Sequence, residues 1–235
     1  MRSTDKTARI AGAAYLSLAL ITPFVLLYIP GKLIVSGNAT QTAQNVLAHE
    51  TLFRFGIVAG LFSTAIFICV AVLLYRLLRD VHKTTATLML GLVLVSATVG
   101  FANNLNHLAA LTLFRGENFL TVFDKPQLDA LGMLFLRLHS QADYMNEILW
   151  GLWLLPLGLL VFWSGFLPRF IGVWLIINCF AYVALSIIAL MFPALYGVAL
   201  SWATPLLLGE LVLALWLLVK GAKMQPRAVA ASAST

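Results

Sequence analysis

Three ionisable side chains recur at every fourth position in the second half of the chain: His139, Asp143 and Glu147. On a helix this spacing places all three on one face. Asn103 and His107 are also four residues apart, in an earlier apolar stretch. Two histidines and two carboxylates at a common depth can bind a divalent metal or form a proton relay. These residues are therefore the first candidates for chemistry.

A third interpretation of this polar cluster is purely structural. With Asn104 included, its members fall near the predicted membrane–water boundary, where polarity costs little and a hydrated polar ring can join helix ends. The sequence contains no His-Glu-x-x-His or other dense metal motif. We therefore favour the polar ring or a substrate- or proton-binding role. A metal site at His107, His139, Asp143 and Glu147 remains a weaker alternative.

Glu210 is a sharper anomaly because it lies in an apolar stretch. It precedes Lys220 by ten residues, about 15 Å along a helix and close to the bilayer midplane. A charge there costs at least about 2.5 kcal/mol, so we expect a neutral carboxyl group. Asn178, about 12 Å from the same membrane edge, is the expected hydrogen-bonding partner. Glu210 is either a proton-coupled or substrate-binding acid, or half of a Glu–Asn bond that fixes helix packing.

These residues must be positioned by membrane-spanning helices. The chain has 235 residues, of which 61% are hydrophobic and 10% charged, too few charges to cover a soluble protein. A helix needs about 20 apolar residues to cross a bilayer. Six stretches meet or nearly meet that length: Ile10–Ile29, Leu52–Leu78, Ala86–Phe114, Tyr144–Trp163, Phe170–Phe192 and Val198–Val219.

The distribution of basic residues predicts the topology. When the loops are assigned alternately to two sides, ten Lys and Arg residues fall on the side of both termini and five on the other. By the positive-inside rule both termini are cytoplasmic. The net charge of +6 then reflects topology and contact with anionic lipid, so we expect a lipid bilayer and no nucleic acid as partner.

Two further helices are predicted outside the membrane. Thr40–Glu50 has an apolar edge and predicts a short amphipathic helix before the second span. The 38 residues from Pro126 to Trp163 would form a helix of about 57 Å, longer than a whole bilayer, so their first half should be an extracytoplasmic amphipathic helix before span four. A kink is expected near Pro156. The fold class is an all-α bundle of six spans in one domain, residues 1–220, followed by a disordered cytoplasmic tail, residues 221–235.

Several runs resemble a bacterial multi-pass membrane family, domain of unknown function 4386. They are Lys6–Gly12, the stretch around Asn106–Leu111, Trp150–Gly158 with its Trp-Gly-Leu-Trp-Leu-Leu-Pro-Leu-Gly sequence, and Ser164–Arg169. The resemblance implies a bacterial inner-membrane protein without an assigned activity, and supplies no catalytic residues. It also implies that the positions of His107 and Glu147 often hold an amide such as glutamine, a poor metal ligand, which weakens the metal interpretation.

The leading functional hypothesis is a non-enzymatic membrane protein that binds or passes a small molecule or proton. A polar vestibule at the outer surface would lead to Glu210, and no cofactor is expected. The alternatives are an intramembrane metal-dependent enzyme and a non-catalytic accessory or assembly subunit of a membrane complex.

Overall fold

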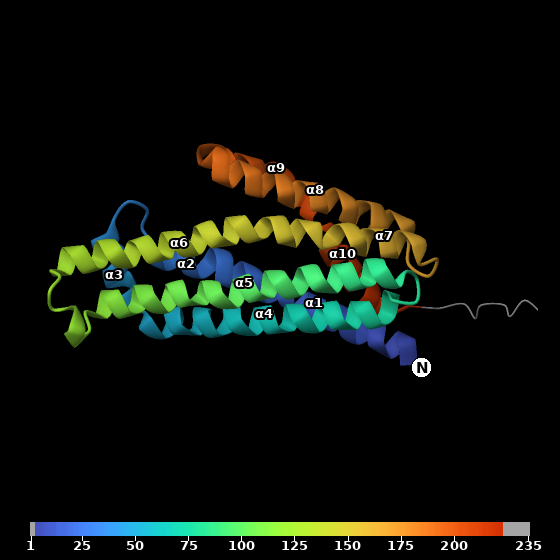
Figure 1. Cartoon of the computed structure of the whole chain (residues 1–235), viewed down its shortest axis with the longest axis horizontal. Helices are drawn as coiled ribbons and strands as arrows, with labels where there is room; N and C mark the ends of the chain where they lie inside the picture. The colour runs from blue at the N-terminus through green and yellow to red at the C-terminus, as the bar shows by residue number, and fades with distance from the viewer. Residues whose placement is uncertain (1–2, 223–235) are drawn as a thin grey trace, which may run out of the picture.

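The protein is a bundle of long helices that lie side by side (Figure 1). The computed structural model describes residues 3–222, and within that range it is all-helical, with no strand. Six segments of these described residues are long and apolar enough to cross a membrane, so the prediction of an all-α bundle with six candidate spans is confirmed. Apart from Gly221 and Ala222, the predicted tail lies outside the described residues.

Both ends of the described chain lie at the same end of the bundle (Figure 1). We call this end, where α1 begins and α10 ends, the basal end, and the opposite end the apical end. Span one is a run of three helices: α1 (Ser3–Pro23), η1 (Phe24–Tyr28) and α2 (Ile29–Leu33). The π-helical turn η1 follows Pro23, whose missing N–H disturbs the regular helical pattern.

The amphipathic helix predicted before span two is present as α3 (Ala39–Ala48), and it leads into α4 (Glu50–Leu78). The Asn38 side chain caps α3 by accepting a hydrogen bond from the Gln41 backbone N–H at 2.9 Å. Val46 is fully buried, so the apolar edge of α3 packs against the bundle. This prediction is confirmed.

Span four begins differently from the prediction, because no separate amphipathic helix precedes it. Spans three and four are α5 (Lys83–Arg115), the 3-10 turn η2 (Asn118–Leu120), α6 (Lys125–Leu152) and α7 (Leu154–Trp163). The first half of α6 continues directly into its second half and packs against the bundle, with Phe114 of α5 close to Gly132 and α3 against the same helix. The helix is interrupted at Trp153, three residues before Pro156, near the expected kink.

The last two spans are α8 (Arg169–Met191), the turn η3 (Pro193–Leu195), α9 (Tyr196–Leu207) and α10 (Gly209–Val219). Span six is thus broken into two half-helices. Pro205 removes one helical hydrogen bond and Gly209 has low helix propensity, which together explain a break at this position. The two halves have different neighbours, since α9 packs mainly on α8 whereas α10 packs on α1 and α8.

Two separate apolar cores hold the bundle together. The basal core is formed by α1, α4, α5, α7, α8 and α10, and its fully buried members include Leu74, Met89, Leu157, Leu160, Ile171 and Leu217. The apical core is formed by α2 to α6 and contains Leu33, Val46, Phe53, Leu111, Phe114 and Leu136. Within a bilayer such packing replaces the hydrophobic effect as the source of helix association.

Candidate functional site

The break in span six exposes backbone groups at the depth of Glu210. Two side chains of α8 bind the last carbonyl groups of α9. Trp174 donates its Nε1–H to the Leu206 carbonyl oxygen at 2.8 Å, and Asn178 donates its Nδ2–H to the Leu207 carbonyl oxygen at 3.3 Å. A helix end inside a membrane needs such partners, since water is not available to supply them.

Glu210 lies in the first turn of α10, directly after this break. The Tyr15 hydroxyl of α1 donates a hydrogen bond to Glu210 Oε2, and the Tyr182 hydroxyl of α8 is a second hydrogen-bonding partner of the carboxyl group. The sequence predicted Asn178 as the partner of this acid, whereas the structure pairs the carboxyl group with two tyrosines. Asn178 uses its amide N–H on the Leu207 carbonyl, because the helix break creates a stronger need there.

Tyr182 connects Glu210 to a second acid on α6. Its Cβ would lie 3.0 Å from a Cβ added at Gly151, so the tyrosine packs directly on that glycine. Glu147 is one helical turn from Gly151, on the same face of α6. The Tyr182 hydroxyl interacts electrostatically with both Glu210 and Glu147. Of the two acids, only Glu210 is hydrogen-bonded to this hydroxyl.

Glu147 is buried, with 7% of its surface exposed. Its Oε1 accepts a 2.6 Å hydrogen bond from the Tyr196 hydroxyl at the start of α9, while Oε2 is buried without a partner. The Tyr196 ring also packs against Tyr144, with centroids 4.7 Å apart. Glu147 thus faces α8 and α9, and not the histidine pair.

Asp143 lies one turn further towards the apical end and faces α5. Its Oδ1 accepts a 2.9 Å hydrogen bond from Asn103 Nδ2, and its Oδ2 lies 3.3 Å from His139 Nε2. Asn103 also donates to the His139 carbonyl oxygen at 2.9 Å. His139 Nδ1 lies 3.2 Å from the Asn103 carbonyl oxygen, so each ring nitrogen of His139 has an acceptor oxygen nearby.

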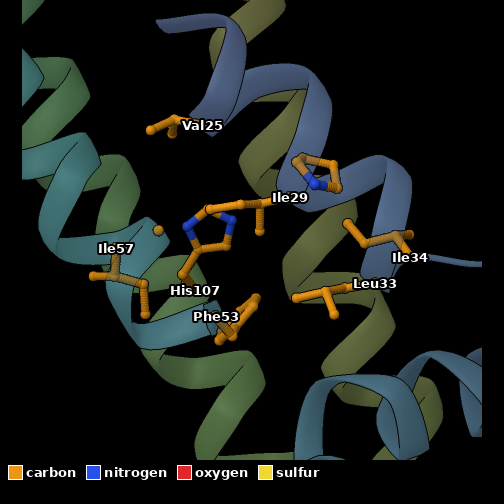
Figure 2. Close-up of a pocket in the computed structure, with 9 residues that line it drawn as sticks. Val25, Ile29, Leu33, Ile34, Phe53, Ile57 and His107 are labelled. Carbon is orange, nitrogen blue, oxygen red and sulfur yellow. The ribbon is translucent and has the colours of Figure 1, made fainter. Parts of the chain in front are cut away.

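The two predicted histidines meet in space. The rings of His107 and His139 are stacked with centroids 3.6 Å apart. His107 Nδ1 is buried without a hydrogen-bonding partner. Figure 2 shows the ring reaching between Ile57 and Ile29, beside an apolar cavity of about 20 Å³. A cavity needs at least about 10–15 Å³ to hold one water molecule, so this one has room for water and not for an organic ligand.

Asn104, by contrast, points away from the predicted cluster. Its Nδ2 donates to the Gly100 carbonyl oxygen at 2.9 Å, and its Oδ1 lies 3.4 Å from a Cβ added at Gly60 of α4. It therefore contributes to the contact between α4 and α5. Of the predicted cluster, α5 and α6 bring together Asn103, His107, His139 and Asp143, whereas Glu147 is directed to Tyr196.

We define the polar file as the side chains that lead from the break in span six towards the apical end. Its members are Glu210, Tyr182, Glu147, Asp143 and His139. In the described part of the chain, every buried polar side chain lies at the level of Asn178 or further towards the apical end. Asn178 is itself about 14 Å from the basal start of α8. Basal to this level the buried side chains of residues 5–222 are apolar.

The geometry does not support a metal centre. Within residues 3–222 no group of three or more His, Cys, Asp and Glu side chains is arranged to hold a metal ion. Glu147 is directed to Tyr196, and the stacked rings of His107 and His139 lie face to face. The predicted residues therefore lie near one another, but their side chains do not point to one position where a metal ion could bind.

Sequence reasoning missed the tyrosines of this site. Tyr15, Tyr182 and Tyr196 lie in stretches that are otherwise apolar, where a tyrosine is easily taken for a packing residue. The depth count that located Glu210 would also have found Tyr15 and Tyr182. They lie about 18 and 20 Å from the basal starts of their helices, against about 15 Å for Glu210.

Comparison with known proteins places these observations in a family context. The family model "Domain of unknown function (DUF4386)" matches residues 10–221. An uncharacterised protein of the archaeon Archaeoglobus fulgidus is 30% identical over 168 residues, which cover 71% of this chain and 85% of that protein. No solved structure matches the chain significantly.

Proposed function

The chain belongs to the DUF4386 family, and from its geometry we propose that it binds and passes protons through the polar file, with Glu210 as the reversible proton acceptor. The observation that carries this proposal is the environment of Glu210. A carboxyl group at mid-depth is held between two tyrosine hydroxyls, Tyr15 and Tyr182. Acids inside a membrane commonly mark proton or substrate pathways.

The remaining members of the file support a route from Glu210 to the apical surface. Tyr182 is hydrogen-bonded to Glu210 and interacts electrostatically with Glu147, and Glu147 is one turn from Asp143, which pairs with His139. Chains of Asp, Glu and His residues are the usual components of proton relays. Water molecules would complete the steps between side chains that are not in direct contact.

The cavity beside His107, whose ring stacks on His139 of the file, has room for water and not for an organic molecule. The cavity beside His107 has a volume of about 20 Å³, against roughly 300–1,000 Å³ for a typical ligand pocket. The unpartnered Glu147 Oε2 and His107 Nδ1 can each bind a water molecule or accept a proton. Both atoms border the proposed route.

The test is proton flux into liposomes that contain the purified protein. A potassium gradient with valinomycin drives the flux, and an enclosed pH-sensitive dye reports it. We expect flux above that of protein-free liposomes and at least about a tenfold loss in Glu210→Gln, because the amide cannot accept the proton. The matched control is Glu117→Gln, which removes an exposed acid at the apical end. Equal flux in Glu210→Gln and the wild type would reject the proposal.

We further propose that the protein lies in the bacterial inner membrane with its basal end towards the cytoplasm. The excess of Lys and Arg on the basal side supports this orientation. The polar file then opens to the outside. The metal-dependent enzyme is a weaker candidate, and stoichiometric metal in the purified protein would revive it.

A further inference from the structure

We propose that the break between α9 and α10 is a binding site for Na⁺, with Asn178 Oδ1 and the Glu210 carboxylate as its side-chain ligands. The inference rests on the proposed role of Glu210 as a group that gains and loses a proton. It adds a second ion that neutralises the same carboxylate.

The first support is a buried oxygen atom without a partner. Asn178 has no exposed surface, and its Oδ1 has no hydrogen-bonding partner. The orientation of the amide is fixed because Nδ2 must face the Leu207 carbonyl oxygen, to which it donates. A Cβ added at Gly209 would lie 3.2 Å from Nδ2, so the amide sits directly against the break. An uncompensated buried oxygen costs about 1–3 kcal/mol, which a bound cation removes.

The second support is the backbone at the break. The C-terminal end of α9 carries a partial negative charge from its last carbonyl groups. The Leu207 carbonyl oxygen binds Asn178 Nδ2 with one lone pair and retains the other. Broken helices at the middle of the membrane commonly supply carbonyl oxygens to Na⁺ in this way.

The third support is the charge balance around Glu210. Between Arg169 and Lys220 the sequence contains no other Asp or Glu and no Lys, Arg or His. The polar groups that face Glu210 are Tyr15 of α1 and Tyr182 of α8, with Glu147 of α6 beyond the latter. None of these residues is cationic. An ionised Glu210 therefore needs a cation from solution, and the surrounding oxygens can coordinate one.

Asn178 and Tyr182 act from the same side of this site. They are four residues apart and share one face of α8. Tyr15 approaches from α1 and donates to Glu210 Oε2, and Tyr182 donates to the same carboxyl group, whose oxygens keep further lone pairs that can bind the ion. A proton and Na⁺ then compete for the carboxylate, so raising the proton concentration displaces Na⁺.

The experiment measures equilibrium binding of ²²Na⁺ to the purified protein in detergent. We expect saturable binding that weakens at low pH, and a Kd about tenfold or more higher in Asn178→Ala than in the wild type. Asn146→Ala is the matched control. It also removes a buried amide with an unpartnered Oδ1, but one bonded to the Ser96 carbonyl between α5 and α6. Binding in this control should equal that of the wild type.

Asn178→Asp provides a second variant because it keeps the size of the side chain and its oxygen while losing the donor to the Leu207 carbonyl, and it should bind Na⁺ more tightly than Asn178→Ala. No saturable binding to the wild type, or equal affinity in Asn178→Ala, would overturn the proposal. Proton flux separates the two proposals. Asn178→Ala should retain Glu210-dependent flux, whereas failure of the proton proposal removes flux from the wild type itself.

Discussion

The Tyr196 hydroxyl and Glu147 Oε1 are joined by a 2.6 Å hydrogen bond that ties the apical end of α9 to α6. The rest of α9 packs mainly on α8, and Trp202 in its middle is 81% exposed to the surroundings of the bundle. The Tyr196 contact therefore determines how closely α9 approaches the polar file.

Removal of this bond should loosen α9. We expect Tyr196→Phe to lower the free energy of unfolding by about 1 kcal/mol, the usual value of a hydrogen bond between membrane helices. Amide hydrogen exchange should accelerate in α9 and not in α10, which packs on α1 as well as α8. Tyr28→Phe is the control, because Tyr28 is 52% exposed. Equal effects of the two substitutions would contradict this assignment.

Asp143 should be important for the stability of the α5–α6 contact. Asp143→Ala leaves Asn103 Nδ2 with one acceptor fewer and deprives His139 Nε2 of its acidic neighbour, so we expect a loss of about 1–3 kcal/mol in reversible unfolding. Asp143→Asn keeps an acceptor oxygen and should cost less. The control is Asp80→Ala, since the Asp80 side chain is 77% exposed. A larger loss in Asp143→Asn than in Asp143→Ala would argue against the hydrogen-bonding role.

Gly158 and Gly172 should be required for the close contact of α7 and α8. A Cβ added at either residue would lie 2.7 Å from the carbonyl oxygen of the other. We expect Gly172→Ala to lower stability by about 1–3 kcal/mol through overpacking, measured by unfolding in mixed detergents. Gly91→Ala is the matched control, because nothing lies within 4 Å of the added Cβ. It should be neutral or stabilising by up to about 1 kcal/mol.

The orientation of the bundle can be checked with reporter fusions. Fluorescent protein joined in the basal turn near Asp80 should mature, as expected in the cytoplasm. Alkaline phosphatase joined near Gly37 or Pro193, at the apical end, should be active outside it. The basis is the twofold excess of Lys and Arg on the basal side. The reverse pattern would mean that the polar file opens to the cytoplasm.

Depth along a helix could be derived from the sequence alone. Counting residues from the helix ends placed Asn103, Asn104 and His107 at the same level as His139 and Asp143. The structure brings His107 into contact with His139 and Asn103 into contact with Asp143. This worked because the rise per residue of a helix is nearly constant.

Rotation about the helix axis and helix breaks could not be derived in this way. Counting gave no indication that Asn104 faces α4, or that Glu147 faces Tyr196 across the bundle. The break at Leu208 created backbone acceptors that drew Asn178 away from Glu210. A pattern of apolar residues carries little information on such choices, since all faces of these helices are apolar.

The apolar basal core has an electrical consequence. Leu74, Leu157 and Leu217 are fully buried between Glu210 and the basal face, so this half of the protein excludes water. In a membrane held at a voltage, the field concentrates across such a layer of low permittivity. An ion that reaches Glu210 from the apical side therefore crosses only part of the membrane potential. The free energy of binding this ion at Glu210 should then change with voltage by less than the full value of about 2.3 kcal/mol per charge at 100 mV.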